Sequence, residues 1–321
     1  MKRGTKIWLI VAASLVLLGI IIFGGVMAFL KWDFRKFGTG RFETNTYEIS
    51  EEFRDISIDT DTADVAFLKS EDGKCRIVCY EEEKLKHSVS AVDGTLDIER
   101  IDTRKWYDHI RLFSFGNSMI RVYLPEAEYA RLSIKESTGD VGIPNEFSFE
   151  AIDIEGSTGD VNCYASARGL IKIDISTGNI CLEELSAGEL ELSTSTGKIS
   201  LSSVECDGDI DISVDTGKTK LCDVSCKNLE SDGDTGDISL ERVIAAESFE
   251  IERDTGDVSF DGCDAAEIFV ETSTGDVLGS LLSEKIFIAQ TGTGKVDVPE
   301  STSGGKCKIA TSTGDIKIRV E

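Results

Sequence analysis

Hydrophobic and polar residues recur in the same order about every 19 or 20 residues through the C-terminal two thirds of the chain. Each repeat contains a Thr-Gly pair, followed by a residue that is usually polar and then by one that is usually β-branched. A fixed period of this length is typical of stacked repeats, in which each unit buries its apolar side chains against its neighbours. The glycines that mark the repeats are Gly139, Gly159, Gly178, Gly197, Gly217, Gly236, Gly256, Gly275, Gly294 and Gly314.

Apolar rows lie on both sides of these glycines. The second and fourth residues after the glycine are apolar or cysteine in nine of the ten repeats, as at Val141 and Ile143. The seventh and fifth residues before it follow the same rule, as at Leu132 and Ile134. The residues between them are usually polar, and this alternation with a period of two predicts short, half-buried strands. Glycine permits a sharp corner between them.

These patterns predict an all-β fold, a parallel β-solenoid of about ten coils of 19–20 residues. A propeller or a sandwich would require longer blades or irregular spacing. We expect residues 132–321 to form the solenoid repeats and residues 42–131 to form an N-terminal β-rich capping region. Within that region, Asp61–Val65 resembles the motif, with Ala63 in place of the glycine.

An uncharged apolar run occupies residues 7–30. A helix of this length rises about 36 Å, enough to cross a hydrocarbon core of about 30 Å. We therefore predict a tail at 1–6, a transmembrane helix at 7–30 and a basic juxtamembrane linker at 31–41. A cleavable signal peptide is the alternative. The basic residues on the two sides are nearly balanced, but the short tail favours a single-pass protein of the cell membrane with an extracytoplasmic C-terminal domain.

The formal net charge of the chain is −25, and it arises from residues 42–321, because residues 1–41 hold seven basic residues and one acidic residue. An acidic surface favours solubility and repels phosphate groups. We therefore expect no nucleic-acid partner. The acidic surface also suggests cation bridging to, or repulsion from, an anionic envelope polymer.

Aspartate often follows the motif glycine, and Asp237, Asp257 and Asp276 do so in three consecutive repeats. Stacked carboxylates are weak candidates for a calcium site, because calcium requires several oxygen ligands. Lysine in three other repeats interrupts the row, and the hydrogen bonding of turns explains aspartate without an ion. We expect no cofactor.

The cysteines offer one candidate cross-link. Cys206 and Cys226 each lie nine residues after their own motif glycine, in successive repeats. Stacking would place their Cα atoms about 5 Å apart, within the range of a disulfide. The chain has two histidines, His87 and His109, which we interpret as structural or exposed. The spacing of cysteine and histidine does not indicate a zinc site.

No insertion interrupts the repeats to house a catalytic site, and no catalytic motif is present. We therefore predict that the protein is not an enzyme. We also expect the last strand of the sequence to form the open edge of the solenoid. Lys317, Arg319 and Glu321 would discourage pairing with another chain there. The chain is thus expected to be a monomer.

The repeated STGDV corners, as at 137–141 and 157–161, follow a single apolar N-terminal segment. Together they resemble a bacterial family of unknown function, known as the "putative adhesin" or β-strand-repeat family. The resemblance covers about residues 42–321. It implies an extracytoplasmic β-solenoid, often encoded near envelope-stress proteins, and it supplies no catalytic residues.

Two functions remain open from the sequence. The first is a membrane-anchored, non-enzymatic binding or scaffold module at the bacterial cell envelope, with an envelope polymer or a membrane protein as its partner. A regular surface with one row of side chains per position suits such partners. The second is an accessory or sensor component of a membrane or envelope-stress regulatory system.

Overall fold

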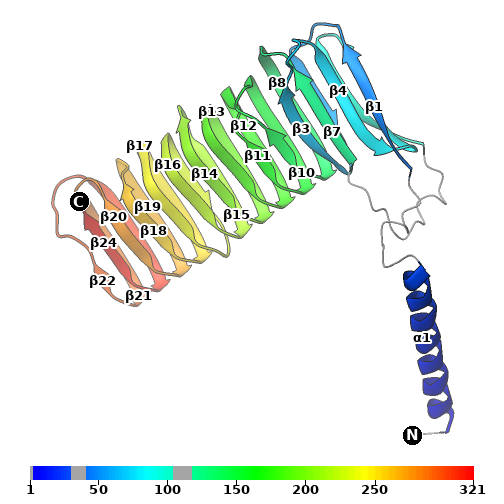
Figure 1. The fold of residues 1–321 in the computed structure, drawn as a ribbon. Helices are drawn as coiled ribbons and strands as arrows, with labels where there is room; N and C mark the ends of the chain where they lie inside the picture. The colour runs from blue at the N-terminus through cyan, green and yellow to red at the C-terminus, as the bar shows by residue number, and fades with distance from the viewer. Residues whose placement is uncertain (1–2, 30–40, 104–117) are drawn as a thin grey trace.

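The computed structural model describes residues 3–29, 41–103 and 118–321. Residue 30, most of the predicted linker and His109 lie outside these ranges. The all-β prediction is confirmed: in the described ranges, helix α1 (Arg3–Phe29) precedes 24 strands that join into one wound sheet (Figure 1).

The N-terminal strands are β1 (Phe42–Ile49), β2 (Asp55–Asp59), β3 (Ala63–Lys69), β4 (Cys75–Glu82), β5 (Leu85–Val92), β6 (Thr95–Asp102) and β7 (Ser118–Leu124). The repeat strands are β8 (Glu128–Thr138), β9 (Val141–Ile143), β10 (Ser148–Thr158), β11 (Val161–Cys163), β12 (Ser166–Thr177), β13 (Ile180–Thr196), β14 (Ile199–Cys206), β15 (Ile210–Thr216), β16 (Thr219–Asp232), β17 (Ile238–Thr255), β18 (Val258–Cys263), β19 (Glu267–Thr274), β20 (Val277–Leu281), β21 (Lys285–Thr293), β22 (Val296–Asp297), β23 (Gly305–Thr313) and β24 (Ile316–Val320).

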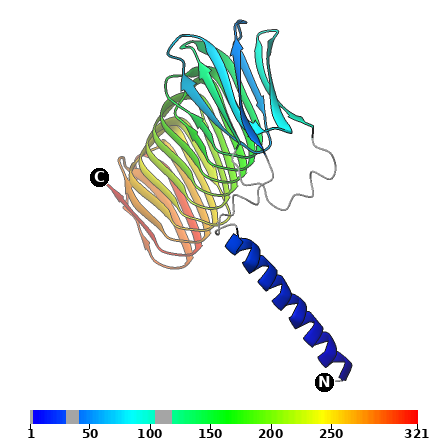
Figure 2. The ribbon, with the colours of Figure 1, turned by 45° about the vertical axis from the view of Figure 1, so that its right-hand side comes forward.

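Each repeat forms one coil, and successive coils stack in parallel and in register. Ile152 of β10 pairs with Leu132 of β8, and Val161 of β11 pairs with Val141 of β9. Figure 2 shows the coils one behind another along the axis of the solenoid. Strands paired in this way lie about 4.8 Å apart, so equivalent residues of neighbouring coils form straight rows.

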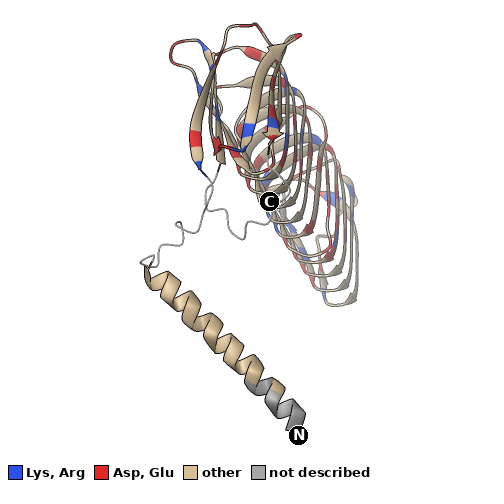
Figure 3. Ribbon diagram, turned by 90° about the vertical axis from the view of Figure 1, so that its right-hand side faces the viewer, with Lys and Arg blue, Asp and Glu red and all other residues tan. Residues whose placement is uncertain are grey.

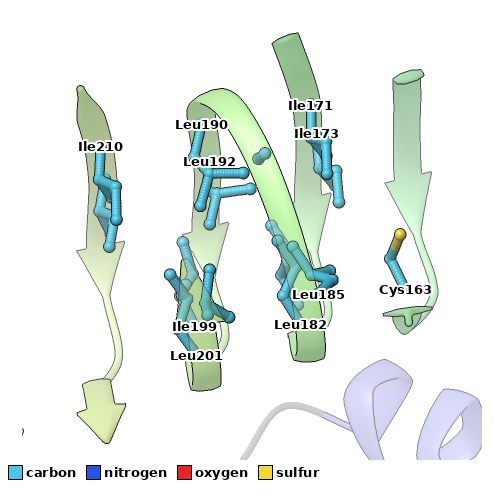
Figure 4. Close-up of a cluster of buried hydrophobic side chains, with 14 of the residues drawn as sticks. Cys163, Ile171, Ile173, Leu182, Leu185, Leu190, Leu192, Ile199, Leu201 and Ile210 are labelled. Carbon is cyan, nitrogen blue, oxygen red and sulfur yellow. The ribbon is translucent and has the colours of Figure 1, made fainter. Parts of the chain in front are cut away.

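The interior consists of the apolar rows that the sequence predicts. Leu190 and Leu192 of β13 lie at most 2 % exposed, and Ile199 and Leu201 of β14 at most 1 %. Figure 4 shows these side chains gathered between neighbouring strands. Full burial of such a side chain contributes about 1.5–3 kcal/mol, so the core that repeats from coil to coil holds the solenoid together.

A second corner, which the repeat pattern did not predict, lies six residues after the motif glycine. Glu184, Ser203, Asp223 and Arg242 there have left-handed backbones, with φ between 51° and 55°. Gly262 occupies the same place in the next coil, with φ 62°. A short third row of strand residues follows this corner, as in the pairing of Leu185 with Val204.

At the N-terminal end, β2 and β3 form a genuine coil that stacks on the coil of β8 and β9. Thr62 bridges to Thr138, so Ala63 does take the place of the motif glycine. β6 and β7 stack on the outer side of β2 and β3. β5 then pairs antiparallel with β6, while β4 and β1 extend the other wall. The predicted boundary between residues 131 and 132 falls inside β8, and the domain division stays a prediction.

At the C-terminal end, the expectation that the last strand forms the open edge is wrong. β24 lies between β20 and β22, and β23 lies between β19 and β21. The coil that ends the sequence is therefore covered on both sides, and Ile316 and Ile318 are at most 2 % exposed. The coil of β21 and β22 ends the stack instead, with Ile288 51 % exposed. Lys317 and Arg319 thus lie beside neighbouring strands.

Candidate functional site

The outward positions of one long wall carry a row of carboxylates. By register, Glu191 pairs with Asp211, Asp211 with Glu230, and Glu230 with Glu250. A second row two residues further along includes the paired residues Glu252 and Glu271. We call these two rows the acidic face. Figure 3 shows acidic residues recurring from coil to coil along the stack.

Among the described residues, the ion pairs on this wall lie at its N-terminal end. Lys172 Nζ lies 2.6 Å from a carboxylate oxygen of Glu191, and Arg131 Nη2 lies 2.7 Å from one of Asp153. Within the part of the chain that the structure describes, no ion pair reaches the acidic residues that follow: Asp211, Glu230, Glu250, Glu252 and Glu271.

The carboxylates of the acidic face affect one another. Partial burial raises the pKa of Asp211, and the nearby carboxylates of Asp232 and Glu191 raise it further. The pKa of Glu230 is raised for the same two reasons, with Asp211 as its strongest acidic neighbour. The face therefore holds concentrated negative charge that a cationic partner would relieve.

The aspartates after the motif glycines form hydrogen bonds along the stack. Asp257 N donates to Asp237 Oδ1 at 3.2 Å, Asp276 N to Asp257 Oδ1 at 2.8 Å, and Asp315 N to Asp276 Oδ1 at 2.7 Å. Each carboxylate thus satisfies a backbone amide of the neighbouring coil. Lys295 lies in the end coil, and its backbone N–H donates to Asp315 Oδ1 at 2.8 Å. Calcium binding by the three candidate aspartates stays a prediction.

The motif glycines form a continuous row because the corners of adjacent coils nearly touch. A Cβ atom on Gly217 would overlap the carbonyl oxygen of Gly197, and the same holds for Gly197 over Gly178. The row reaches Ala63 at the N-terminal end, since a Cβ on Gly139 would overlap the carbonyl oxygen of that residue.

Cys206 and Cys226 occupy adjacent coils, as the repeat spacing predicts. Their neighbours Glu205 and Ser225 are paired in the ladder, and both cysteines are less than 8 % exposed. The structure has both thiols free. Burial raises the pKa of Cys226 to about 12, and the nearby Cys206 adds to the shift. The cross-link between them stays a prediction.

An open cleft of about 850 Å³ lies at the N-terminal end of the solenoid, where the turns between the first strands meet. Its lining includes Phe53 and Tyr129, whose rings stack with centroids 6.0 Å apart. Tyr129 donates a hydrogen bond to the carbonyl oxygen of Pro125 at 2.9 Å. The charged residues around the cleft are Glu48, Glu51, Glu52, Arg54, Asp55, Lys74 and Glu128. The repeat pattern does not predict this cleft, because its lining comes from four separate connections between strands.

One family model matches residues 53–214 and again residues 206–321, and its description is Toastrack DUF4097. The two matches together span nearly all of the wound sheet. The chain belongs to the Toastrack DUF4097 family. The resemblance to a β-strand-repeat family of unknown function is thereby confirmed.

Solved structures similar to this Toastrack chain share little sequence with it. A protein named as a putative adhesin from Parabacteroides distasonis is 12% identical, with a TM-score of 0.45, over 88% of this chain and 98% of its own. Another from Parabacteroides merdae is 11% identical, with a TM-score of 0.44, over 88% and 98%. A protein named as a putative cell adhesion protein from Clostridium sporogenes is 11% identical, with a TM-score of 0.22, over 88% and 100%. No curated protein matches the chain.

The Toastrack core also contains one carboxylate without a hydrogen-bond partner among the described residues. Both carboxylate oxygens of Glu136 are buried and have no hydrogen-bond partner. Glu136 pairs in register with Gly156 of the next coil, which has no side chain to displace the carboxylate. Burial raises the pKa of Glu136 to about 8, and the nearby Asp140 and Asp64 raise it further. Glu136 is three residues before its motif glycine, a place that threonine holds at Thr194 and Thr272.

A second buried polar group of the Toastrack chain lies in the N-terminal cap. Cys79 and Glu81 of β4 and His87 of β5 are each at most 5 % exposed. One donor atom from each lies within 4.8 Å of the others. From the sequence, His87 is expected to be structural or exposed, and no link between His87 and Cys79 is predicted. The sequence does indicate that Cys79 and Glu81 share a face, because they lie two residues apart on one predicted strand.

Proposed function

We propose that this Toastrack chain is a non-enzymatic binding module that presents its acidic face to a cationic partner at the bacterial cell envelope. The observation that carries the proposal is the in-register row of Asp211, Glu230 and Glu250, which lacks ion pairs among the described residues. Like charges paired across strands oppose folding. A polymer or protein segment with amines at similar spacing would offset that cost.

Attachment to the membrane through α1 is part of the proposal. Residues Val11–Phe29 form a helix with a mean hydropathy of 2.5, long and apolar enough to cross a membrane. A signal sequence has the same length and composition. An uncleaved anchor with the solenoid outside the cytoplasm would keep the acidic face close to envelope polymers and membrane proteins.

Binding of the full chain to isolated envelope tests this function. The test variant carries Asp211→Asn, Glu230→Gln and Glu250→Gln, and a matched control carries Glu184→Gln, Glu205→Gln and Asp207→Asn on exposed positions elsewhere. We expect the test variant to bind at least about tenfold more weakly, and the binding of the original chain to weaken as salt rises. Equal binding by all three proteins would refute the role of the acidic face.

The second candidate, an accessory or sensor subunit of an envelope-stress system, is favoured by the surface of α1. Gly19, Gly24 and Gly25 of α1 have no side chain that would keep another helix at a distance. Small residues permit close approach of two membrane helices. Replacing Gly24 and Gly25 by leucine would abolish stress signalling but leave envelope binding intact if this function holds. Unchanged signalling would exclude it.

A further inference from the structure

The buried polar group of the N-terminal cap joins its two walls. Glu81 Oε2 lies 2.7 Å from His87 Nδ1 and accepts the backbone N–H of His87 at the same distance. Nε2 of His87 lies 2.9 Å from the hydroxyl of Thr60. β4 belongs to the wall of β3 and β7, while β5 belongs to the wall of β2 and β6.

Three donor types of different chemistry meet at this point. Cys79, Glu81 and His87 offer a sulfur, a carboxylate oxygen and an imidazole nitrogen, all within 4.8 Å of one another. A thiolate and an imidazole favour zinc and similar transition metals, whereas calcium and magnesium favour oxygen ligands alone. Three protein ligands leave one place in a tetrahedral shell for water.

We propose that Cys79, Glu81 and His87 form a binding site for a divalent transition metal ion of the zinc type. The site lies away from the acidic face and does not depend on the proposed function. The Nδ1 atom of His87 serves as the ligand, because it already faces the carboxylate oxygen that must also bind. Nε2 then donates its proton to Thr60 Oγ1, as the second nitrogen of a metal-bound histidine usually does to a nearby acceptor.

Other contacts hold these ligands in place before any ion arrives. Asn45 Nδ2 donates a hydrogen bond of 2.7 Å to Glu81 Oε1, the carboxylate oxygen that does not face His87. The hydroxyl of Tyr47 donates to the carbonyl oxygen of His87 at 3.0 Å. Both supporting residues come from β1. A prepared second shell of this kind orients ligands and raises metal affinity.

Charge balance favours the ion in this buried place. Binding replaces the proton of the Cys79 thiol with the metal and releases that proton to the solvent. A divalent ion with one thiolate and one carboxylate has no net charge, so the filled site avoids the high cost of a buried unpaired ion.

Without metal, Glu81, His87 and Thr60 are already joined to one another by hydrogen bonds. A purely structural role for these bonds predicts that zinc neither binds nor stabilises the cap. If the metal site exists, zinc cross-links β4 and β5, and the thermal stability of the chain is higher when zinc is present. The two roles therefore differ in a measurable way.

Cobalt titration of the full chain, reduced and stripped of metal in detergent, provides the first test. Cobalt(II) at the site should give a thiolate-to-cobalt charge-transfer band that zinc displaces. Cys79→Ser should abolish this band. Cys75→Ser is the matched control, because Cys75 lies on the same strand and is also buried. The control should keep the band.

Two further measurements keep the proposal open to refutation if Cys79→Ser folds poorly. Zinc should raise the unfolding temperature of the original chain and of Cys75→Ser, but not that of Cys79→Ser. X-ray absorption of the zinc-loaded original chain should show one sulfur at about 2.3 Å with lighter ligands at about 2.0–2.2 Å. Absence of the cobalt band, its persistence in Cys79→Ser, or a zinc spectrum without sulfur would overturn the site.

Discussion

The Nη2 atom of Arg253 lies 2.8 Å from the hydroxyl of Ser231 inside the solenoid and 3.3 Å from that of Thr219. Ser231 and Thr219 are polar exceptions in two otherwise apolar rows. A Cβ on Gly233 would lie 3.1 Å from Nη1 of the same arginine. Burial lowers the pKa of Arg253. Thr219, Ser231 and Gly233 depart from the repeat pattern, and together they accommodate the buried guanidinium group of Arg253.

Ser231→Ala should therefore destabilise the protein by about 1–3 kcal/mol, because it removes a hydrogen bond from a buried charged group. Ser239→Ala, at an outward position of β17, should change the stability by less than about 0.5 kcal/mol. Chemical denaturation of both variants measures the difference. Equal stability would show that Arg253 gains little from Ser231.

Stability should depend on pH through Glu136. Its pKa is raised from 4.5 to about 8 in the folded chain, chiefly by burial. The folded state thus favours the protonated form. The stabilisation from this proton is complete below pH 4.5 and is lost as the pH rises towards about 8.

Glu136→Gln should remove this dependence, because the amide keeps the shape of the acid but carries no charge. At pH 8.5 the variant should be more stable than the original chain by a few kcal/mol, since each pKa unit corresponds to about 1.4 kcal/mol. At pH 4 the two should be nearly equal. Urea unfolding at both pH values provides the measurement, and a constant difference between the proteins would contradict the raised pKa.

The left-handed corner gives opposite predictions for two adjacent serines. Ser203 has φ 55°, a backbone that costs an L-residue about 1–2 kcal/mol and glycine almost nothing. Ser203→Gly should therefore stabilise the protein by about 0.5–1 kcal/mol, as Gly262 already occupies this place in another coil. Ser202→Gly, in ordinary strand, should destabilise it by about 0.5–1 kcal/mol. Shifts of the same sign in thermal unfolding would disprove the argument.

The sequence predicted those parts of the structure that repeat. The apolar rows at Val141 and Leu132 and the corner glycines follow directly from the period. The insertion of β24 between β20 and β22 does not, because the distance from Gly294 to Gly314 is the same 20 residues as between ordinary coils. Spacing along the chain shows that coils form, but not the order in which they stack.

In the candidate functional sites, too, the features that repeat are predictable and those that occur once are not. The outward carboxylates of the acidic face recur with the period. Which of the described carboxylates form ion pairs depends on the register and on where the basic residues lie. His87 joins Cys79 only because the β4–β5 hairpin brings the two walls of the cap together. Contacts that arise once, between residues outside the repeat, leave no periodic signal.

The row of glycine corners can be tested at one position. Gly217 lies over the carbonyl oxygen of Gly197, so the methyl group in Gly217→Ala would force two coils apart. The coils on both sides are held by paired strands, so we expect a loss of about 3 kcal/mol or more in the free energy of unfolding. Gly142→Ala is the control, because a Cβ there meets no atom within 4 Å, and it should be neutral or stabilising by up to about 1 kcal/mol. If both variants unfold at the same denaturant concentration as the original chain, the close approach of the corners does not determine stability.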